Sequence, residues 1–193
     1  MIQPVQNHDF AGVYIDIESG GFSPKQNPLL EYGWGFLNQD YTIESGDSIC
    51  ILPQAGKVIE PTAAMINGYS EDRWAERGAI DIDAARARII ELFAPYDSII
   101  AFAHNAPFDK NWTEEYIPEI MPKIREWQCT QKWLRRYCNA NGIPIEKGTL
   151  KLENGCKLAG YRQVDRHGAL EDCFSGAGLT RFLVSSGVPY RDN

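Results

Sequence analysis

The chain has 193 residues, a formal net charge of −7 and 44% hydrophobic residues, an ordinary composition for a globular protein. This length suits a single α/β domain over residues 1–193 and is short for two. No apolar run is long enough to span a membrane, and the negative charge excludes a simple basic nucleic-acid binder. The five cysteines form no C-x-x-C pair, so we expect free thiols in a reducing, cytoplasmic setting.

The first quarter of the chain predicts three strands. Apolar and β-branched residues over 13–17 predict a buried strand that ends at a glycine pair, residues 20–21. Apolar side chains then alternate over 29–37, and a short turn at 38–40 precedes a hairpin partner over 41–52. Because short turns join these strands, they are expected to pair as an antiparallel meander.

Two carboxylates lie near the end of the first predicted strand. Asp16 and Glu18 are two residues apart, so on a strand they project from one face, roughly 6.5–7 Å apart. An acidic pair on an apolar strand is unfavourable unless a positive charge lies between the side chains. A hard divalent cation such as Mg²⁺ binds carboxylate oxygens directly. From this stretch alone, two hypotheses stay open: a metal site, or two solvated acids at a strand end.

The remaining chain predicts helices and two further strands. Residues 98–103 are almost continuously apolar, which predicts a strand covered on both faces, and residues 123–128 predict a short edge strand. Periodic apolar residues and breaker residues predict helices over 62–68, 81–93, 107–116, 130–139, 150–159 and 170–184.

Two later segments carry further acids and histidines. His104 begins the sequence H-N-x-x-F-D, which ends at Asp109, and His167 begins the sequence H-x-A-x-x-D, which ends at Asp172. With the earlier D-x-E pair, these motifs make the chain resemble the DEDDh 3′–5′ exonucleases of the DnaQ-like, ribonuclease H-like superfamily. Each motif alone is a weak signal, but the three occur in the family's order over nearly the whole chain. The resemblance implies an α/β fold with a mixed five-stranded sheet, the antiparallel meander plus two further strands, flanked by helices.

The resemblance also implies a two-metal mechanism for phosphodiester hydrolysis that releases nucleoside 5′-monophosphates. It implies two Mg²⁺ ions, with Mn²⁺ able to substitute. Asp16 would bridge the ions, Glu18 and Asp172 would complete the protein ligands of the first, and Asp109 would position the second. His167 would act as general base, because an unperturbed imidazole accepts a proton near neutral pH. The alternative for His167 is a polar loop residue or a helix-end cap. His104 is expected to orient its loop.

Four further residues are candidates for substrate contacts. Ser19 follows the D-x-E pair, where the family holds the 3′-terminal sugar, and it replaces the family's usual threonine while keeping the hydroxyl. Asn105 could donate to a phosphate or sugar, and Phe108 could stack on the terminal base. Met65 lies on a short apolar helix that could wedge against the last bases. Core packing is the alternative for both Phe108 and Met65. Asn67 stands where the family often has a histidine.

The charge is unevenly distributed along the chain. Residues 1–100 contain 6 Lys+Arg and 15 Asp+Glu, whereas residues 121–170 contain 10 Lys+Arg and 4 Asp+Glu. An acidic half with a metal site, beside a basic stretch, suits an enzyme that grips a short piece of polyanion. It does not suit a protein that coats long DNA, which needs many phosphate contacts.

The expected partner is the 3′ end of a nucleic acid, with single-stranded DNA or frayed ends favoured. An RNA-trimming exonuclease is the first alternative, because no residue here distinguishes deoxyribose from ribose. The other is a proofreading or interaction subunit that depends on a polymerase partner. An endonuclease of the same superfamily fits less well, since the H-x-x-x-x-D spacing is typical of the exonuclease branch.

Overall fold

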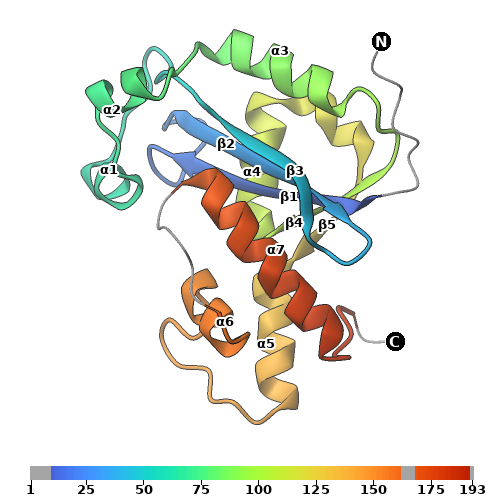
Figure 1. The fold of residues 1–193 in the computed structure, drawn as a ribbon. Coiled ribbons are helices and arrows are strands. Elements are labelled where there is room, and N and C mark those ends of the chain that lie inside the picture. Colours follow the sequence, from blue (N-terminus) through green and yellow to red (C-terminus); the bar gives the residue numbers. More distant parts are fainter. Residues whose placement is uncertain (1–9, 162–167, 192–193) are drawn as a thin grey trace.

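A mixed sheet with the strand order β3-β2-β1-β4-β5 forms the centre of the computed structural model, which describes residues 10–161 and 168–191 (Figure 1). Strands β1, β2 and β3 pair antiparallel, while β4 and β5 continue the sheet parallel to β1. The meander and the two added strands are therefore confirmed. The strand bounds are β1 Phe10–Ser19, β2 Leu29–Asn38, β3 Ile43–Cys50, β4 Ile99–Ala103 and β5 Ile124–Cys129.

Helices flank both faces of this sheet, with α7 in front and α4 behind it in the view of Figure 1. The bounds are α1 Pro61–Asn67, α2 Glu71–Glu76, α3 Ile82–Phe93, α4 Ala106–Tyr116, the 3-10 helix η1 Pro118–Lys123, α5 Thr130–Ala140, α6 Leu152–Leu158 and α7 Ala169–Ser185. Apart from α2 and η1, which have no counterpart among the predicted helices, these agree with the prediction to within about two residues, the usual variation at helix ends. In the part of the chain that the structure describes, none of these helices combines the length and apolarity needed to cross a membrane.

The alternation of β1 divides the interior into two layers. Val13, Ile15 and Ile17 belong to the largest apolar cluster, together with residues of α3 and α4. Tyr14, on the opposite face, packs with Cys173 and Ala177 of α7. Because side chains alternate along a strand, Asp16 and Glu18 share the face of Tyr14 and point toward α7.

Two glycines let α7 approach the sheet closely. A Cβ atom on Gly33 of β2 would lie 2.6 Å from the carbonyl carbon of Ala169, and one on Gly176 of α7 would overlap the ring of Tyr14. The absence of side chains at these positions brings the first turn of α7 against β1 and β2. All five cysteines are buried free thiols, as the composition predicted.

Candidate active site

Three carboxylates from two distant segments converge at the end of β1. Asp16 and Glu18 project from β1, and Asp172 lies in the first turn of α7. One ligand oxygen from each lies within 4.8 Å of the other two. All three side chains are partly exposed, so a ligand can reach them. The pair predicted from the strand and the acid predicted from the last helix therefore form one cluster.

The electrostatics of the cluster favour a cation. Burial, and then the charge of Asp172, raises the pKa of Glu18 to about 8. Burial and the charges of Asp172, Asp109 and Glu18 raise the pKa of Asp16 well above its usual range. Carboxylates held close together in a partly desolvated site raise each other's pKa. A divalent cation relieves the repulsion between them. Carboxylate oxygens are the ligands that Mg²⁺ and similar hard ions prefer, so the donor set fits such a metal.

A fourth acid, Asp109, lies beside this cluster on the first turn of α4. Its side chain is buried, and burial raises its pKa to about 8 although a backbone hydrogen bond from Ile17 opposes the rise. Asp109 also raises the pKa of both Asp16 and Glu18, so its charge reaches the cluster.

These raised pKa values predict that the metal-free protein loses stability as the pH rises. A carboxyl with a folded pKa above its unfolded value keeps its proton in the folded state, so between about pH 4.5 and 8 the folded protein binds more protons than the unfolded chain. Unfolding free energy then falls with rising pH. The expected loss is on the order of a few kcal/mol, and it levels off above the folded pKa values.

Thermal melts across this pH range, in EDTA and in Mg²⁺ or Mn²⁺, measure the effect. We expect the metal to raise Tm more at pH 8 than at pH 5, because it replaces protons that are present at pH 5. A Tm in EDTA that stays constant from pH 5 to 8, with no response to either metal, would contradict the electrostatic account of the cluster.

Of the two histidines in the motifs, the structure describes His104. The His104 ring lies between Thr130 Oγ1 at 3.2 Å and the Leu150 carbonyl oxygen at 2.7 Å. Burial lowers its pKa to about 4, so the ring is neutral and joins β4 to α5 and to the segment before α6. This fits the expected orienting role. His167 lies outside the described residues.

The four predicted substrate residues lie in different environments. Ser19 is buried, and its hydroxyl donates to the Gly21 carbonyl oxygen at 2.7 Å. Met65 on α1 is 78% exposed, which excludes core packing for this side chain. Asn105 is exposed at the start of α4. Phe108 is half-buried and packs against Trp112, with the ring centres 5.8 Å apart, so the core-packing alternative accounts for much of its surface.

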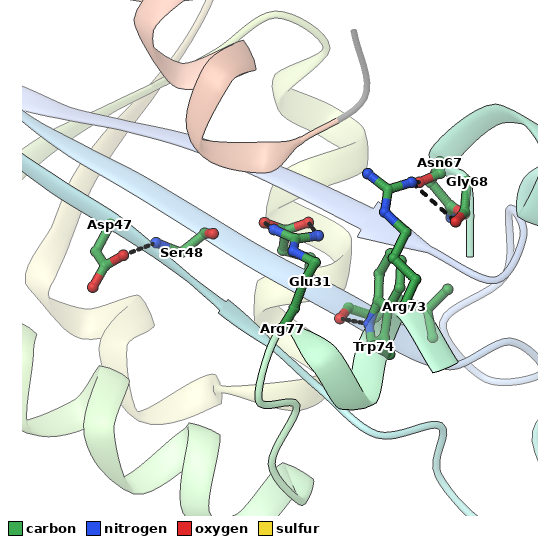
Figure 2. Close-up of polar contacts among 9 residues, drawn as sticks. Glu31, Asp47, Ser48, Asn67, Gly68, Arg73, Trp74 and Arg77 are labelled. Carbon is green, nitrogen blue, oxygen red and sulfur yellow. Dashed lines mark hydrogen bonds and ion pairs between the residues drawn. The ribbon is translucent and has the colours of Figure 1, made fainter. Parts of the chain in front are cut away.

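A network of polar contacts fixes α1 to the end of β1 and α2 to the start of β2, and Figure 2 shows the part of it around Arg73 and Trp74. The buried Asn67 amide donates to the Ser19 carbonyl oxygen at 3.0 Å. Arg73 donates in turn to the carbonyl oxygens of Asn67 and Gly68, and the Trp74 indole N–H donates to the Leu30 carbonyl oxygen at 2.9 Å. Asn67 therefore has a positioning contact in place of the family's histidine.

A buried ion pair completes this network, and the sequence analysis missed it. Glu31 of β2 is fully buried and accepts two hydrogen bonds from Arg77, at 2.6 and 2.8 Å, which Figure 2 shows. Glu31 is the sheet partner of Glu18. Its charge raises the pKa of Glu18 while that of Arg77 lowers it, so the pair belongs to the electrostatic surroundings of the cluster.

One exposed aromatic residue near the site was also missed. Phe22 is 81% exposed and follows the Gly20–Gly21 break directly after β1. A Cβ atom on Gly21 would lie 2.5 Å from Asn27 Cγ and Glu60 Oε1, so the turn passes where only glycine fits. The signal available from the sequence was an aromatic residue within an otherwise polar loop.

Sequence comparison finds relatives over most of the chain, although no family model matches it. Ribonuclease T of Shewanella frigidimarina (strain NCIMB 400) is 28% identical over 196 residues, covering 92% of this chain and 85% of that relative. Ribonuclease T of Shewanella denitrificans is 28% identical over 195 residues, covering 93% of this chain and 84% of that relative. The alignments include the region of all three acid motifs.

Solved nuclease structures share the fold. E. coli Exonuclease I in complex with a dA16 oligonucleotide matches with a TM-score of 0.73 at 16% identity, over 90% of this chain but only 40% of that one. The nuclease domain of 3′hExo, a DEDDh family member bound to rAMP, matches with a TM-score of 0.70 at 15% identity. The match covers 97% of this chain and 98% of that one. The ordered acid motifs and the ribonuclease T relatives support a DEDDh-type 3′–5′ exonuclease, and the chain shares the fold of the two solved nucleases.

Proposed function

We propose that the chain hydrolyses phosphodiester bonds at the 3′ end of a nucleic acid, with divalent metal, and releases nucleoside 5′-monophosphates. The observation that carries this proposal is the convergence of Asp16, Glu18 and Asp172, whose oxygens lie within 4.8 Å of one another. Buried Asp109 beside them supports a second ion position. A cluster of acids without this order of motifs would be weaker support, because exposed acidic groups also occur without metals.

In this proposal the four acids hold two Mg²⁺ ions, for which Mn²⁺ can substitute. Such ions, when bound, activate water and stabilise the charge that develops on the phosphate. Asp16, Glu18 and Asp172 would hold the first ion and Asp109 would position the second. Glu31 takes no part in binding, since Arg77 already occupies both of its carboxylate oxygens.

The proposed general base is His167, which would remove a proton from the attacking water. Its place in the H-x-A-x-x-D motif, five residues before Asp172, carries this assignment. Neighbouring cations lower the pKa of an imidazole, because they disfavour its charged form, and the neutral ring is the form that a base needs. His104 is not an alternative, because both of its ring nitrogens are already within hydrogen-bonding distance of protein oxygens.

The substrate is proposed to be a single-stranded 3′ end or a frayed duplex end. DNA and RNA both have support from the matched proteins: the exonuclease I structure holds a deoxyadenosine oligonucleotide, and 3′hExo holds rAMP. RNA trimming is the second candidate, because the sequence relatives are named ribonuclease T. None of these names or titles points to a polymerase partner, so the polymerase-dependent alternative has no support.

Exposed apolar side chains beside the cluster are candidates to contact the terminal bases. Phe22 and Met65 project into solvent from the loop after β1 and from α1, and α1 is tied to Ser19 by Asn67. Stacking of one base on an aromatic ring contributes about 1–3 kcal/mol. We therefore expect Phe22→Ala to raise KM for an oligonucleotide about fivefold or more, with a smaller change in kcat.

Val184→Ala is a matched control, since Val184 is also exposed but lies at the far end of α7. Steady-state kinetics on one oligonucleotide compare the two variants. An unchanged KM for Phe22→Ala, or an equal change in both variants, would remove Phe22 from the proposed binding surface.

A time course with matched DNA and RNA oligonucleotides of one sequence tests the proposed reaction. Nucleoside 5′-monophosphates should be the first products in Mg²⁺, detected by chromatography, and the faster substrate identifies the preferred sugar. Internal fragments as the first products would contradict an exonuclease and favour an endonuclease of the same superfamily.

A further inference from the structure

Two neighbouring hollows on the surface carry positive charge although the chain as a whole is acidic. The first, of about 590 Å³, lies over α4, β5 and the start of α5, and the second, of about 630 Å³, lies over α5. Lys132 lines both, so the two hollows adjoin, and together they are here called the basic groove. Its charged lining residues are Lys110, Arg125, Lys132, Arg135, Arg136, Arg191 and Glu126.

The positive charges of the basic groove are largely uncompensated. Lys110, Arg125, Lys132 and Arg135 are exposed, and no hydrogen bond or ion pair joins their side chains to another residue within 10–161 or 168–191. The acid in the groove, Glu126, pairs with Arg191 at 2.7 Å. The charges of Glu126 and Arg191 cancel. The other charged residues of the groove are all positive, although the chain has a net charge of −7.

The pattern along α5 explains how the helix presents this charge. Lys132, Arg135, Arg136 and Asn139 follow the spacing i, i+3, i+4 and i+7, so they lie on one face of the helix. The opposite face is buried in the core through Trp133, Leu134 and Cys138. The basic face therefore lies outside the packed core, and repulsion among its like charges opposes stability.

The first part of the basic groove lies on the N-terminal turn of α4, the helix that also carries the buried Asp109. Ala106, Pro107 and Lys110 line its first part, and these residues belong to the same turn of α4 that carries Asp109. From there the groove crosses the edge strand β5 and follows α5, which runs away from the sheet in Figure 1. A strand whose 3′ end lay at the carboxylates would find phosphate-binding groups in this direction.

We propose that the basic groove binds the phosphate backbone of the nucleic-acid strand upstream of the 3′ end that is cut. This inference rests on the proposed function and adds a second binding region to it. Lysine and arginine neutralise phosphates regardless of base sequence and release condensed counterions, which makes such binding depend on salt. Trp127, which also lines the groove, offers an aromatic surface of the kind that accompanies such backbone contacts.

The test compares the double variant Lys132→Ala/Arg135→Ala with wild type on single strands of about 5 and about 20 nucleotides. Binding of the longer strand is measured by fluorescence anisotropy in EDTA, where no turnover occurs, over a range of salt concentrations. Removing two phosphate contacts should lower the slope of log K against log salt by about 1.4. In Mg²⁺, the preference for the longer over the shorter strand, expressed as a ratio of KM values, should fall several-fold.

The control is Arg88→Ala/Arg181→Ala, which removes two exposed arginines from α3 and α7 and leaves the groove intact. An unchanged salt slope in the groove variant, or an equal change in the control, overturns the proposal. So does a change of oligomeric state by light scattering with unaltered binding, because the groove would then be an interface between copies. If the wild-type protein cuts neither strand, the proposed function fails. The binding comparison in EDTA then still shows whether the groove binds the phosphate backbone.

Discussion

Replacing Asp16 by asparagine is expected to lower kcat about a thousandfold or more. Asp16 is central to the carboxylate cluster, since Asp172, Asp109 and Glu18 all act on its pKa. Bound metal contributes several kcal/mol of transition-state stabilisation, and each 1.4 kcal/mol corresponds to a factor of ten in rate. Steady-state kinetics at saturating Mg²⁺ measure the loss.

The same substitution should make the metal-free fold more stable at pH 8, because it removes one of several repelling charges. A simultaneous loss of activity and gain in Tm separates a functional acid from a structural one. The control is Asp47→Asn, an exposed carboxylate on β3 whose contact is with the backbone of the next residue (Figure 2). Near-wild-type activity of Asp16→Asn would contradict its assignment as a metal ligand.

Replacing Arg77 by methionine is expected to cost about 3 kcal/mol of unfolding free energy. The substitution leaves Glu31, whose side chain is fully buried, without its bidentate partner. The value lies at the low end for a broken buried pair because the Arg77 side chain is 28% exposed. For a protein of this size, Tm should fall by about 6–12 °C, which thermal melts and urea titrations measure at a fixed metal concentration.

Two companion variants make this test specific. Glu31→Gln combined with Arg77→Met should recover much of the loss, because no buried charge remains unpaired. Arg86→Met is the surface control, since Arg86 pairs with Glu119 where both side chains are 39% exposed, and it should cost less than about 1 kcal/mol. Equal destabilisation by Arg77→Met and Arg86→Met would contradict the assignment of the Glu31–Arg77 pair as a buried one.

The elements that sequence analysis predicted are those that depend on local patterns. A run of apolar and β-branched residues identified β1, alternating side chains identified β2, and the two-residue spacing put Asp16 and Glu18 on one face. That Asp172 joins these two acids was predicted from the family resemblance. No local pattern around Asp172 indicates that it lies near Asp16, which is 156 residues earlier in the chain. The structure places the two acids in one cluster.

The features that were missed depend on contacts between distant residues. Glu31 and Arg77 are 46 residues apart, and Ser19 and Asn67 are 48 apart, so no periodicity links them. A glutamate in an alternating strand predicts an exposed side chain, yet Glu31 is buried because Arg77 neutralises it. The close packing of α7 also depends on Gly33 and Gly176, whose role emerges only when α7 meets β1 and β2.

The most direct test of the central claim is the shortening of a single strand labelled at its 5′ end, in Mg²⁺, in Mn²⁺ and in EDTA. Wild type and Asp172→Asn are compared, because Asp172 brings α7 into the carboxylate cluster. We expect a ladder that shrinks from the 3′ end in the presence of either metal and is absent in EDTA, with a rate about a thousandfold lower in the variant. Shortening that persists in EDTA, or an equal rate in the variant, would show that the cluster is not the metal-dependent centre of the reaction.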